Sequence, residues 1–209
     1  IPYETYLAFK DDKKQSDLLK EFDRRTIAAG KQRWVEKTPT HVRKIDELLR
    51  LTPDARIIVM LRDGRDVACS IRDRTDDFEK GVKRWIRDNR EAEKYLSDSQ
   101  FCRIRYERIV RKFEEAIGKA LRFCGERFEE KMWKYHEEPK YFFSEEISKP
   151  DSVKDGKGHD QYRNWQINQP IFDGSGRWKS EMKEKEKNYF KKEAGKMLIK
   201  YGYSEDLEW

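Results

Sequence analysis

The residues best suited to chemistry stand at the end of a short apolar run. Arg62 follows the run Arg56-Ile-Ile-Val-Met-Leu61, and Ser70 comes eight residues later, beyond the turn residue Gly64. The planar fork of an arginine and a hydroxyl could bind one phosphate together, and a helix that begins between them would favour an anion at its N-terminus. The alternative is that residues 62–66 form a cluster of ion pairs on the surface. The residue types alone leave both interpretations open.

Arg62 and Ser70 must be positioned by strands and helices, and three segments of the sequence are candidate strands. Residues 56–61 are a continuous apolar run with β-branched residues, which predicts a strand buried on both faces of a parallel sheet. Residues 101–106 alternate apolar and basic side chains and predict a second strand. Residues 31–37, centred on Trp34 and Val35, are a third candidate strand.

Helices are expected around these strands. The signals are apolar residues spaced by three and four, proline in a first turn and glycine at helix ends. They predict helices after Pro39, at about 64–74, over 78–96, from Val110 to an end at Gly125, and before Gly202, with a partly helical lead-in at 12–29. Residues 140–176 are expected to be a long irregular loop.

The alternation of strands and helices predicts an α/β fold, a parallel β-sheet flanked by helices. Ligands of such sheets bind at the carboxyl ends of the strands. The sequence therefore directs attention to Arg62 and to the segment Arg105-Tyr106-Glu107.

Composition and charge exclude several classes of protein. The chain has 209 residues, and its 11 Phe, 10 Tyr and 6 Trp argue against intrinsic disorder. No apolar run approaches the ~18 residues of a membrane span. The 47 Lys and Arg against 41 Asp and Glu leave a net charge of +6, which fits an anionic ligand and does not point to nucleic acid. Three cysteines without a C-x-x-C spacing predict buried free thiols in a reducing compartment, so a cytoplasmic location is expected rather than secretion.

Several motifs, in order along the chain, together resemble the sulfotransferases that use 3′-phosphoadenosine-5′-phosphosulfate (PAPS). They are Trp34-Val-Glu36-Lys37-Thr-Pro-Thr-His41, Pro53-Asp54 through Arg62-Asp-Gly-Arg-Asp-Val-Ala-Cys-Ser70, Arg105-Tyr106-Glu107, Gly176-Arg177-Trp178-Lys179 and Lys200-Tyr201-Gly202-Tyr203. The resemblance covers residues 33–204. It implies the sulfotransferase fold, which is similar to that of P-loop NTPases, and transfer of the sulfuryl group of PAPS to a hydroxyl or amine.

The resemblance also implies roles for individual residues. Arg62 and Ser70 align with the pair that binds the 3′-phosphate of PAPS, and Tyr106 aligns with an aromatic residue near the adenine. Arg177, with Ser175 and Gly176, would close over the 3′-phosphate end. The family often has Arg-Lys-Gly at the preceding element, where this chain has Ile171-Phe172-Asp173, so Arg177 is the substitute cation.

The segment around Glu36 resembles the place where carbohydrate sulfotransferases have a catalytic glutamate. A carboxylate there could take a proton from the acceptor. Cytosolic members of the family use a histidine in a comparable stretch, which makes His41 the rival base. Lys37 could neutralise charge that grows on the leaving oxygen. The reaction requires no metal, and the sequence suggests none.

One departure from the family concerns the start of the chain. The family normally begins with a strand and a loop that binds the 5′-phosphosulfate, and this sequence contains no such loop. We expect residues 1–209 to be a single sulfotransferase domain whose first strand and loop lie upstream of Ile1; true loss of the loop is the alternative.

Two functions therefore remain open. The first is a PAPS-dependent sulfotransferase whose acceptor is a small molecule or glycan, with a carbohydrate, phenol, lipid or peptide all possible. The second is a non-catalytic module of the same fold that binds adenosine bisphosphate or a polyanion. A nucleotide kinase is disfavoured because it needs a Gly-Lys-Ser/Thr loop, which the chain lacks. The oligomeric state cannot be read from the sequence.

Overall fold

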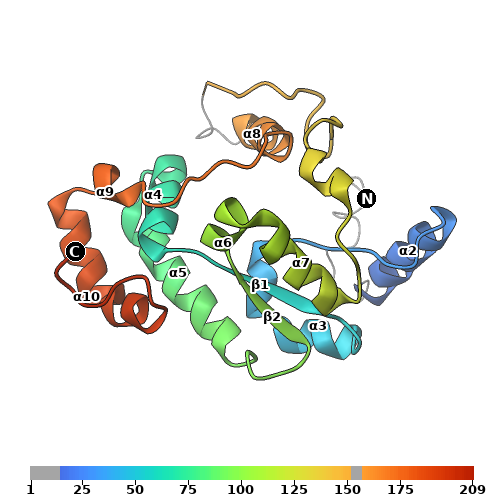
Figure 1. Cartoon of the computed structure of the whole chain (residues 1–209), viewed down its shortest axis with the longest axis horizontal. Coiled ribbons are helices and arrows are strands. Elements are labelled where there is room, and N and C mark those ends of the chain that lie inside the picture. Colours follow the sequence, from blue (N-terminus) through green and yellow to red (C-terminus); the bar gives the residue numbers. More distant parts are fainter. Residues whose placement is uncertain (1–14, 152–156) are drawn as a thin grey trace.

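The fold is α/β, as predicted, and is built on a small parallel sheet (Figure 1). The computed structural model describes residues 15–151 and 157–209. Strand β1 (Ile57–Leu61) pairs in parallel with β2 (Phe101–Arg105), with Ile57 opposite Phe101 and Leu61 opposite Arg105. Both strands are where the sequence predicts them, and their carboxyl ends meet at one edge.

The helices follow in three groups. Before β1 come α2 (Gln15–Ala28), the 3₁₀ helix η2 (Pro39–Arg43) and α3 (Ile45–Leu51); between the strands lie α4 (Gly64–Thr75) and α5 (Phe78–Glu93). After β2 come α6 (Tyr106–Arg111), α7 (Phe113–Cys124), η3 (Glu130–Lys134), α8 (Lys157–Ile167), α9 (Trp178–Glu181) and α10 (Glu184–Lys200). The helices predicted at 64–74, at 78–96 and before Gly202 are confirmed, apart from small shifts of their ends.

Local sequence chemistry sets the ends of α4. The side chain of Asp63 accepts a hydrogen bond from the Arg65 amide at 2.9 Å and caps the helix. Asp76 ends it in the left-handed conformation, with φ of 56°. The cap lies directly after β1, so Arg62 stands between the strand and the first turn of α4.

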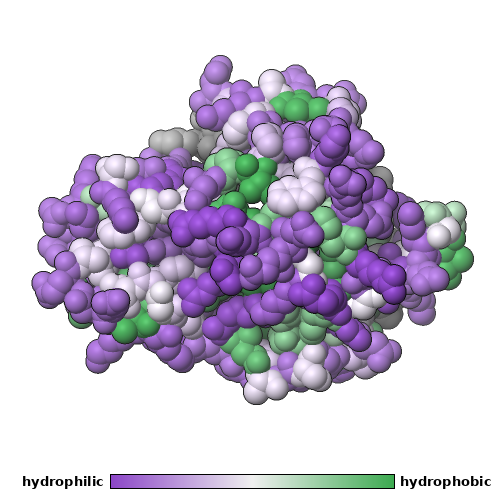
Figure 2. Space-filling model, viewed as in Figure 1, coloured by the Kyte–Doolittle hydropathy of each residue, from purple (hydrophilic) through white to green (hydrophobic). Residues whose placement is uncertain are grey.

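The largest part of the core lies between α4, α5 and α10. Leu61, Val82, Phe190 and Leu198 are at most 1% exposed there. Gly81 lets α4 and α5 approach closely, because a Cβ at this position would lie 2.7 Å from the Ala68 Cα. Hydrophilic residues cover most of the face shown in Figure 2, in keeping with the high charge content.

The prediction of a strand at residues 31–37 is wrong, because this segment is irregular. Val35 is 95% exposed. Trp34 is held by local contacts instead: its ring centroid lies 4.9 Å from that of Phe22, and its indole N–H donates to Asp23 at 2.9 Å. The helix expected after Pro39 is also divided, into η2 and α3.

The prediction that β1 is buried on both faces is wrong as well. Val59 and Leu61 are buried, but Ile58 and Met60 are 42% and 52% exposed. The reason is the arrangement of the helices: the core residues of α7 pack on Cys102 and Ile104 of β2, and no described element covers the same face of β1.

The region 140–176 contains more order than predicted. It includes α8, which lies above the rest of the molecule in Figure 1. The buried side chain of Asn164 accepts from the Phe142 amide at 3.0 Å and donates to the Glu146 carbonyl at 2.8 Å. Asn168 forms a similar pair of bonds with the backbone of Lys140. These amides hold residues 140–146 against α8.

The cysteines are free, as predicted, with Cys69 and Cys102 buried and Cys124 half-buried. Among residues 15–151 and 157–209, no helix has both the length and the apolar character that crossing a membrane requires.

Candidate anion-binding site

A turn formed by residues 173–177 lies over the carboxyl end of β1. The Arg62 guanidinium donates to the Gly174 carbonyl at 2.6 Å and lies 4.1 Å from the centre of the Tyr106 ring. The Gly174 amide in turn donates to the Tyr106 hydroxyl at 3.2 Å. A Cβ at Gly174 would lie 3.3 Å from both Arg62 and Tyr106, so the close approach favours glycine. Arg62 and Tyr106, two of the residues predicted to bind the nucleotide, therefore contact each other and the turn.

Asp66 fastens the turn to α4. Its fully buried carboxylate accepts from the Gly176 amide at 2.8 Å and from the Trp178 amide at 3.1 Å. Burial raises the pKa of Asp66, and the two amide bonds oppose this rise. Gly176 has φ of +79°, which glycine adopts without strain. The position of Gly176 and Arg177 thus depends on one buried carboxylate of α4.

The residues around Asp66 do not form a surface cluster of ion pairs, the alternative considered for residues 62–66. Asp63 and Arg65 are 6% and 4% exposed and pair at 2.7 Å. The Arg65 guanidinium also lies 3.7 Å from the centre of the Trp178 ring and 4.6 Å from that of Trp209. This ion pair is part of the packing between α4 and the C-terminal segment.

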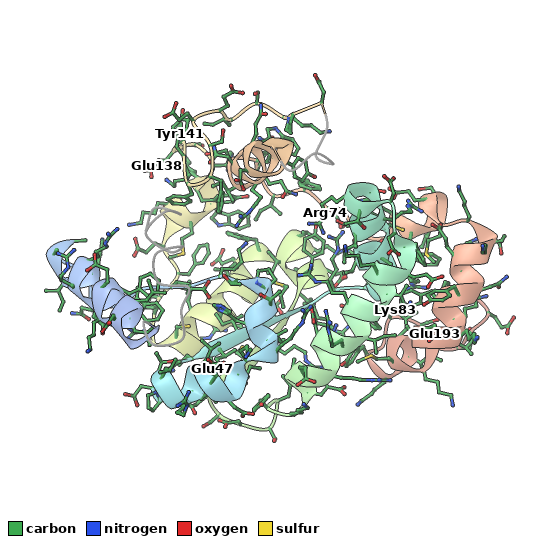
Figure 3. All side chains as sticks on the ribbon, turned by 180° about the vertical axis from the view of Figure 1, so that it is seen from behind. Glu47, Arg74, Lys83, Glu138, Tyr141 and Glu193 are labelled. Carbon is green, nitrogen blue, oxygen red and sulfur yellow. The ribbon has the colours of Figure 1, made fainter. Side chains whose placement is uncertain are left out.

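A cavity of about 310 Å³ lies between α4 and the segment that carries α8. Ser70 and Arg177 both line it, so two more of the predicted nucleotide residues meet there. Its other lining residues are Asp73, Arg74, Lys149, Pro150, Asp151, Tyr162 and Gln166. Figure 3 shows Arg74 at the end of α4 that faces α8. The polar wall combines a hydroxyl with three cationic side chains.

Arg177 is held in this wall by two carboxylates. It forms ion pairs with Asp73 and, at 2.7 Å, with Glu181. The hydrogen bonds from Glu181 and Asp73 outweigh burial and raise the pKa of Arg177. Arg177 is therefore charged and fixed in direction.

Ser175 and Gly176 line a different hollow, on the other side of the turn. This hollow measures about 430 Å³ and also includes Lys179 and Trp209. The Ser175 hydroxyl accepts from Arg111 at 2.8 Å, and Asp173 accepts from the Ser175 amide at 2.9 Å. Of the six residues predicted to bind the nucleotide, Ser175, Gly176 and Arg177 belong to the turn. Arg62 and Tyr106 contact the turn at Gly174, and Ser70 lines a cavity together with Arg177.

The candidate catalytic residues lie together in a second cluster. Nδ1 of His41 lies 2.8 Å from one carboxylate oxygen of Glu36, and the Thr38 hydroxyl donates to the other. Burial alone would raise the pKa of Glu36, but the bonds from His41 and Thr38 prevail and lower it. Lys37 is exposed. The described hydrogen bonds of Glu36 and His41 stay within this cluster and do not reach the 173–177 turn.

Sequence reasoning missed Arg74, Lys149, Tyr162 and Gln166 as lining residues. A signal existed for Arg74 alone, since it follows Ser70 by four residues and shares its helix face. The other three belong to the region that was expected to be an irregular loop, where no periodic pattern assigns side chains to a surface.

Comparison with models of known protein families gives a match. Residues 8–130 match the profile of a sulfotransferase family. The match includes Glu36, Arg62, Ser70 and Tyr106 but ends before the 173–177 turn. A search of curated proteins found no match.

Proposed function

The chain belongs to the sulfotransferase family, and on this premise we propose that it transfers the sulfuryl group of PAPS to a hydroxyl or amine of an acceptor. The observation that carries the proposal is the cavity beside α4, in which Ser70 and Arg177 lie with Arg74 and Lys149. Cations and a hydroxyl around one cavity suit a phosphate monoester, because charge-assisted hydrogen bonds are the strong ones.

The groups that would hold the donor are distributed around the 173–177 turn. Ser70 and the cations of the cavity would bind phosphate oxygens, and Tyr106 offers an aromatic ring near the carboxyl end of β2. Nε of Arg62 is buried and has no hydrogen-bond partner among the described residues, so this guanidinium retains donor capacity. These groups are compatible with an adenosine bisphosphate. PAPS would supply the sulfuryl group.

The proton of the acceptor would leave through the pair of Glu36 and His41. An ionised carboxylate only accepts hydrogen bonds, so Nδ1 of His41 carries the proton that faces Glu36. Nε2 then has the free lone pair, as in other carboxylate–histidine pairs that act as bases. Both Glu36 oxygens are engaged, by Thr38 and His41. We therefore assign the base to His41 and its orientation to Glu36, with Glu36 itself as the alternative base.

Lys37 keeps the role suggested by its place in the sequence. Its exposed ammonium could approach charge that develops on the bridging oxygen of the leaving nucleotide. The acceptor is a small molecule or glycan that carries a hydroxyl or amine.

The proposal is tested by isothermal titration calorimetry of the complete protein with 3′,5′-adenosine bisphosphate, the product of the donor. We expect binding, and Ser70→Ala should weaken it about tenfold through loss of one hydrogen bond to a charged group. Ser180→Ala, at an exposed serine of α9, is the matched control and should leave affinity unchanged. Absence of binding by the wild-type protein would overturn the proposal.

A non-catalytic binding module is the second candidate. One observation is compatible with it: the cations and the hydroxyl of the cavity would bind a bisphosphate whether or not a sulfuryl group is transferred. This candidate predicts the same nucleotide binding without release of bisphosphate from PAPS in the presence of any acceptor. Turnover with one acceptor from a panel of glycans, phenols and amines would exclude it.

A further inference from the structure

The peptide group between Arg62 and Asp63 is held by hydrogen bonds on both of its sides. Its carbonyl oxygen, which belongs to Arg62, accepts from the Trp85 indole of α5 at 3.0 Å. Its N–H, which belongs to Asp63, donates to the Glu107 carboxylate at the start of α6 at 2.9 Å. This N–H has no partner within α4, because Asp63 is the residue that caps the helix. A peptide group is planar, so the two bonds together fix the orientation of the backbone directly after Arg62.

Tyr203, in the segment that follows α10, holds the second oxygen of Glu107. Its hydroxyl donates to that oxygen at 2.9 Å. Burial, together with the charge of Glu107, raises the pKa of Tyr203, so the phenol keeps its proton and remains the donor. Tyr203 is itself fixed by two arginines: the Arg105 guanidinium lies 4.8 Å from the centre of its ring, and Arg65 donates to its carbonyl at 2.9 Å. One carboxylate therefore links the C-terminal segment to the peptide group after Arg62.

Arg62 is the residue on which these bonds act. Leu61, directly before it, pairs with Arg105 of β2, so the sheet fixes the backbone on that side. The Arg62 guanidinium donates to the Gly174 carbonyl at 2.6 Å, and its buried Nε has no hydrogen-bond partner within the described ranges. An arginine whose backbone is fixed on both sides is a pre-oriented donor, and less conformational freedom is lost when it binds an anion.

Glu107 and Tyr203 do not line the cavity that contains Ser70 and Arg177. They line the hollow on the other side of the 173–177 turn. An effect of either residue on a nucleotide in the cavity would therefore pass through the residues that it holds.

We infer that Glu107 and Tyr203 are positioning residues, which hold the backbone at Arg62 in the orientation that the nucleotide requires. The inference rests on the proposed function, because it presupposes that Arg62 contacts the adenosine bisphosphate. It gives a role to Tyr203, which belongs to a motif to which the resemblance assigns none.

A double-mutant cycle tests the inference by calorimetry of the complete protein with 3′,5′-adenosine bisphosphate. Tyr203→Phe should weaken binding about fivefold, because Glu107 loses one of the hydrogen bonds that hold it. In an Arg62→Gln background the same substitution should leave affinity unchanged, because the residue through which it acts is already gone. Glu107→Gln should depend on Arg62 in the same way, because its amide oxygen can replace only one of the two acceptors.

Tyr95→Phe is the matched control. The Tyr95 hydroxyl also donates to a carboxylate, that of Asp46 at 2.8 Å. Its ring stacks on Phe101, which lies at the amino end of β2, the opposite end of the sheet from Arg62. We expect unchanged affinity for the bisphosphate. Circular dichroism at the temperature of the titration shows whether each variant is folded.

Four outcomes would overturn the inference, and they differ in what else they affect. Equal affinity of wild type and Tyr203→Phe rejects the role of Tyr203 and leaves the proposed function intact. A loss of the same size in both backgrounds shows that Tyr203 does not act through Arg62. Unchanged binding by Arg62→Gln alone removes Arg62 from the site, and the inference with it. Failure of the wild type to bind removes the proposed function and the inference together.

Discussion

At the scale of single residues, Glu36 and His41 form the pair that we propose removes the proton of the acceptor. The two side chains come from an irregular segment and from η2, and they meet at 2.8 Å. The carboxylate has no free oxygen in this arrangement, since Thr38 occupies the other one. The pair therefore behaves as one unit, in which the bonds from His41 and Thr38 lower the pKa of Glu36.

The pH dependence of kcat/KM separates the two possible bases. A base works only when deprotonated, so activity should fall as the pH drops through the pKa of the base. A fall well above the ordinary pKa range of carboxylates would exclude Glu36 as the base. With Glu36 as the base, activity should persist to a pH below the ordinary range of a glutamate, because the bonds from His41 and Thr38 lower the pKa of that carboxyl.

Paired variants provide the control for the pH profile. His41→Gln should abolish turnover and leave bisphosphate affinity unchanged, whereas Glu36→Gln should retain part of the activity, because its amide oxygen can still accept from His41. The reverse ranking would assign the base to Glu36.

At the scale of elements, the site depends on the attachment of the 173–177 turn to α4. The turn carries Arg177 and contacts Arg62 through Gly174, but it reaches α4 through the Asp66 carboxylate. Helix α4 thus supplies Asp66, which binds the 173–177 turn, and also Ser70 and Arg74, which lie one and two helical turns further along. A loose turn would widen the cavity from the Arg177 side.

Asp66→Asn should loosen this attachment. Each carboxylate oxygen accepts one amide hydrogen, and a carboxamide can replace only one of them and places its NH₂ group against the other. We expect a loss of about 1–3 kcal/mol in the free energy of unfolding, the usual cost of an unsatisfied buried donor, together with weaker bisphosphate binding. Urea denaturation measures the first effect and calorimetry the second.

Glu184→Gln is the matched control for Asp66→Asn, because its carboxylate is 80% exposed at the start of α10. It should change stability by no more than about 0.5 kcal/mol. An unchanged urea midpoint for Asp66→Asn would show that the turn is held by other contacts.

At the scale of the whole molecule, the core is unevenly distributed around the sheet. Helices α3 and α5 contribute Ile45 and Ala92 to the cluster that packs on Val59 and Phe101. Among the residues that the structure describes, the opposite face is covered over β2 and not over β1. The α8 segment and α10 lie far apart around this sheet (Figure 1), yet the stretch that joins them passes over the carboxyl ends of the strands. The site is thus located where segments distant in sequence converge.

Substitutions on the two faces of β1 should differ in cost. Replacing Ile58 and Met60 together by threonine should lower the free energy of unfolding by less than about 1 kcal/mol, because both side chains are half-exposed. Leu61→Ala, at a side chain that is 1% exposed, should cost about 2–5 kcal/mol. Thermal unfolding measures both, and a single transition is expected if residues 1–209 form one domain. A loss of several kcal/mol in the double variant would mean that this face is covered.

Much of the fold could be predicted because its signals are local. The apolar run at 57–61, the capping residue Asp63 and the three–four spacing in α5 each act within a few residues. The motifs are also short stretches of sequence, and their order along the chain indicated the family without any knowledge of the structure. Local patterns fail where burial depends on a distant partner: Val35 and Ile58 are apolar but exposed, because no described segment packs on them.

The sequence by itself therefore determined the α/β class, the family and the residue types available for phosphate and proton chemistry. The tertiary structure alone decided which of them share a site. Glu36 meets His41, Arg62 meets Tyr106 and Gly174, and Ser70 meets Arg177 across more than a hundred residues of chain. The tertiary structure also places Arg74 in the cavity beside Ser70, and it places the Asp66 carboxylate where it binds the 173–177 turn. The physical reason is that ion pairing and desolvation depend on distances in space, which no short-range pattern of residues records.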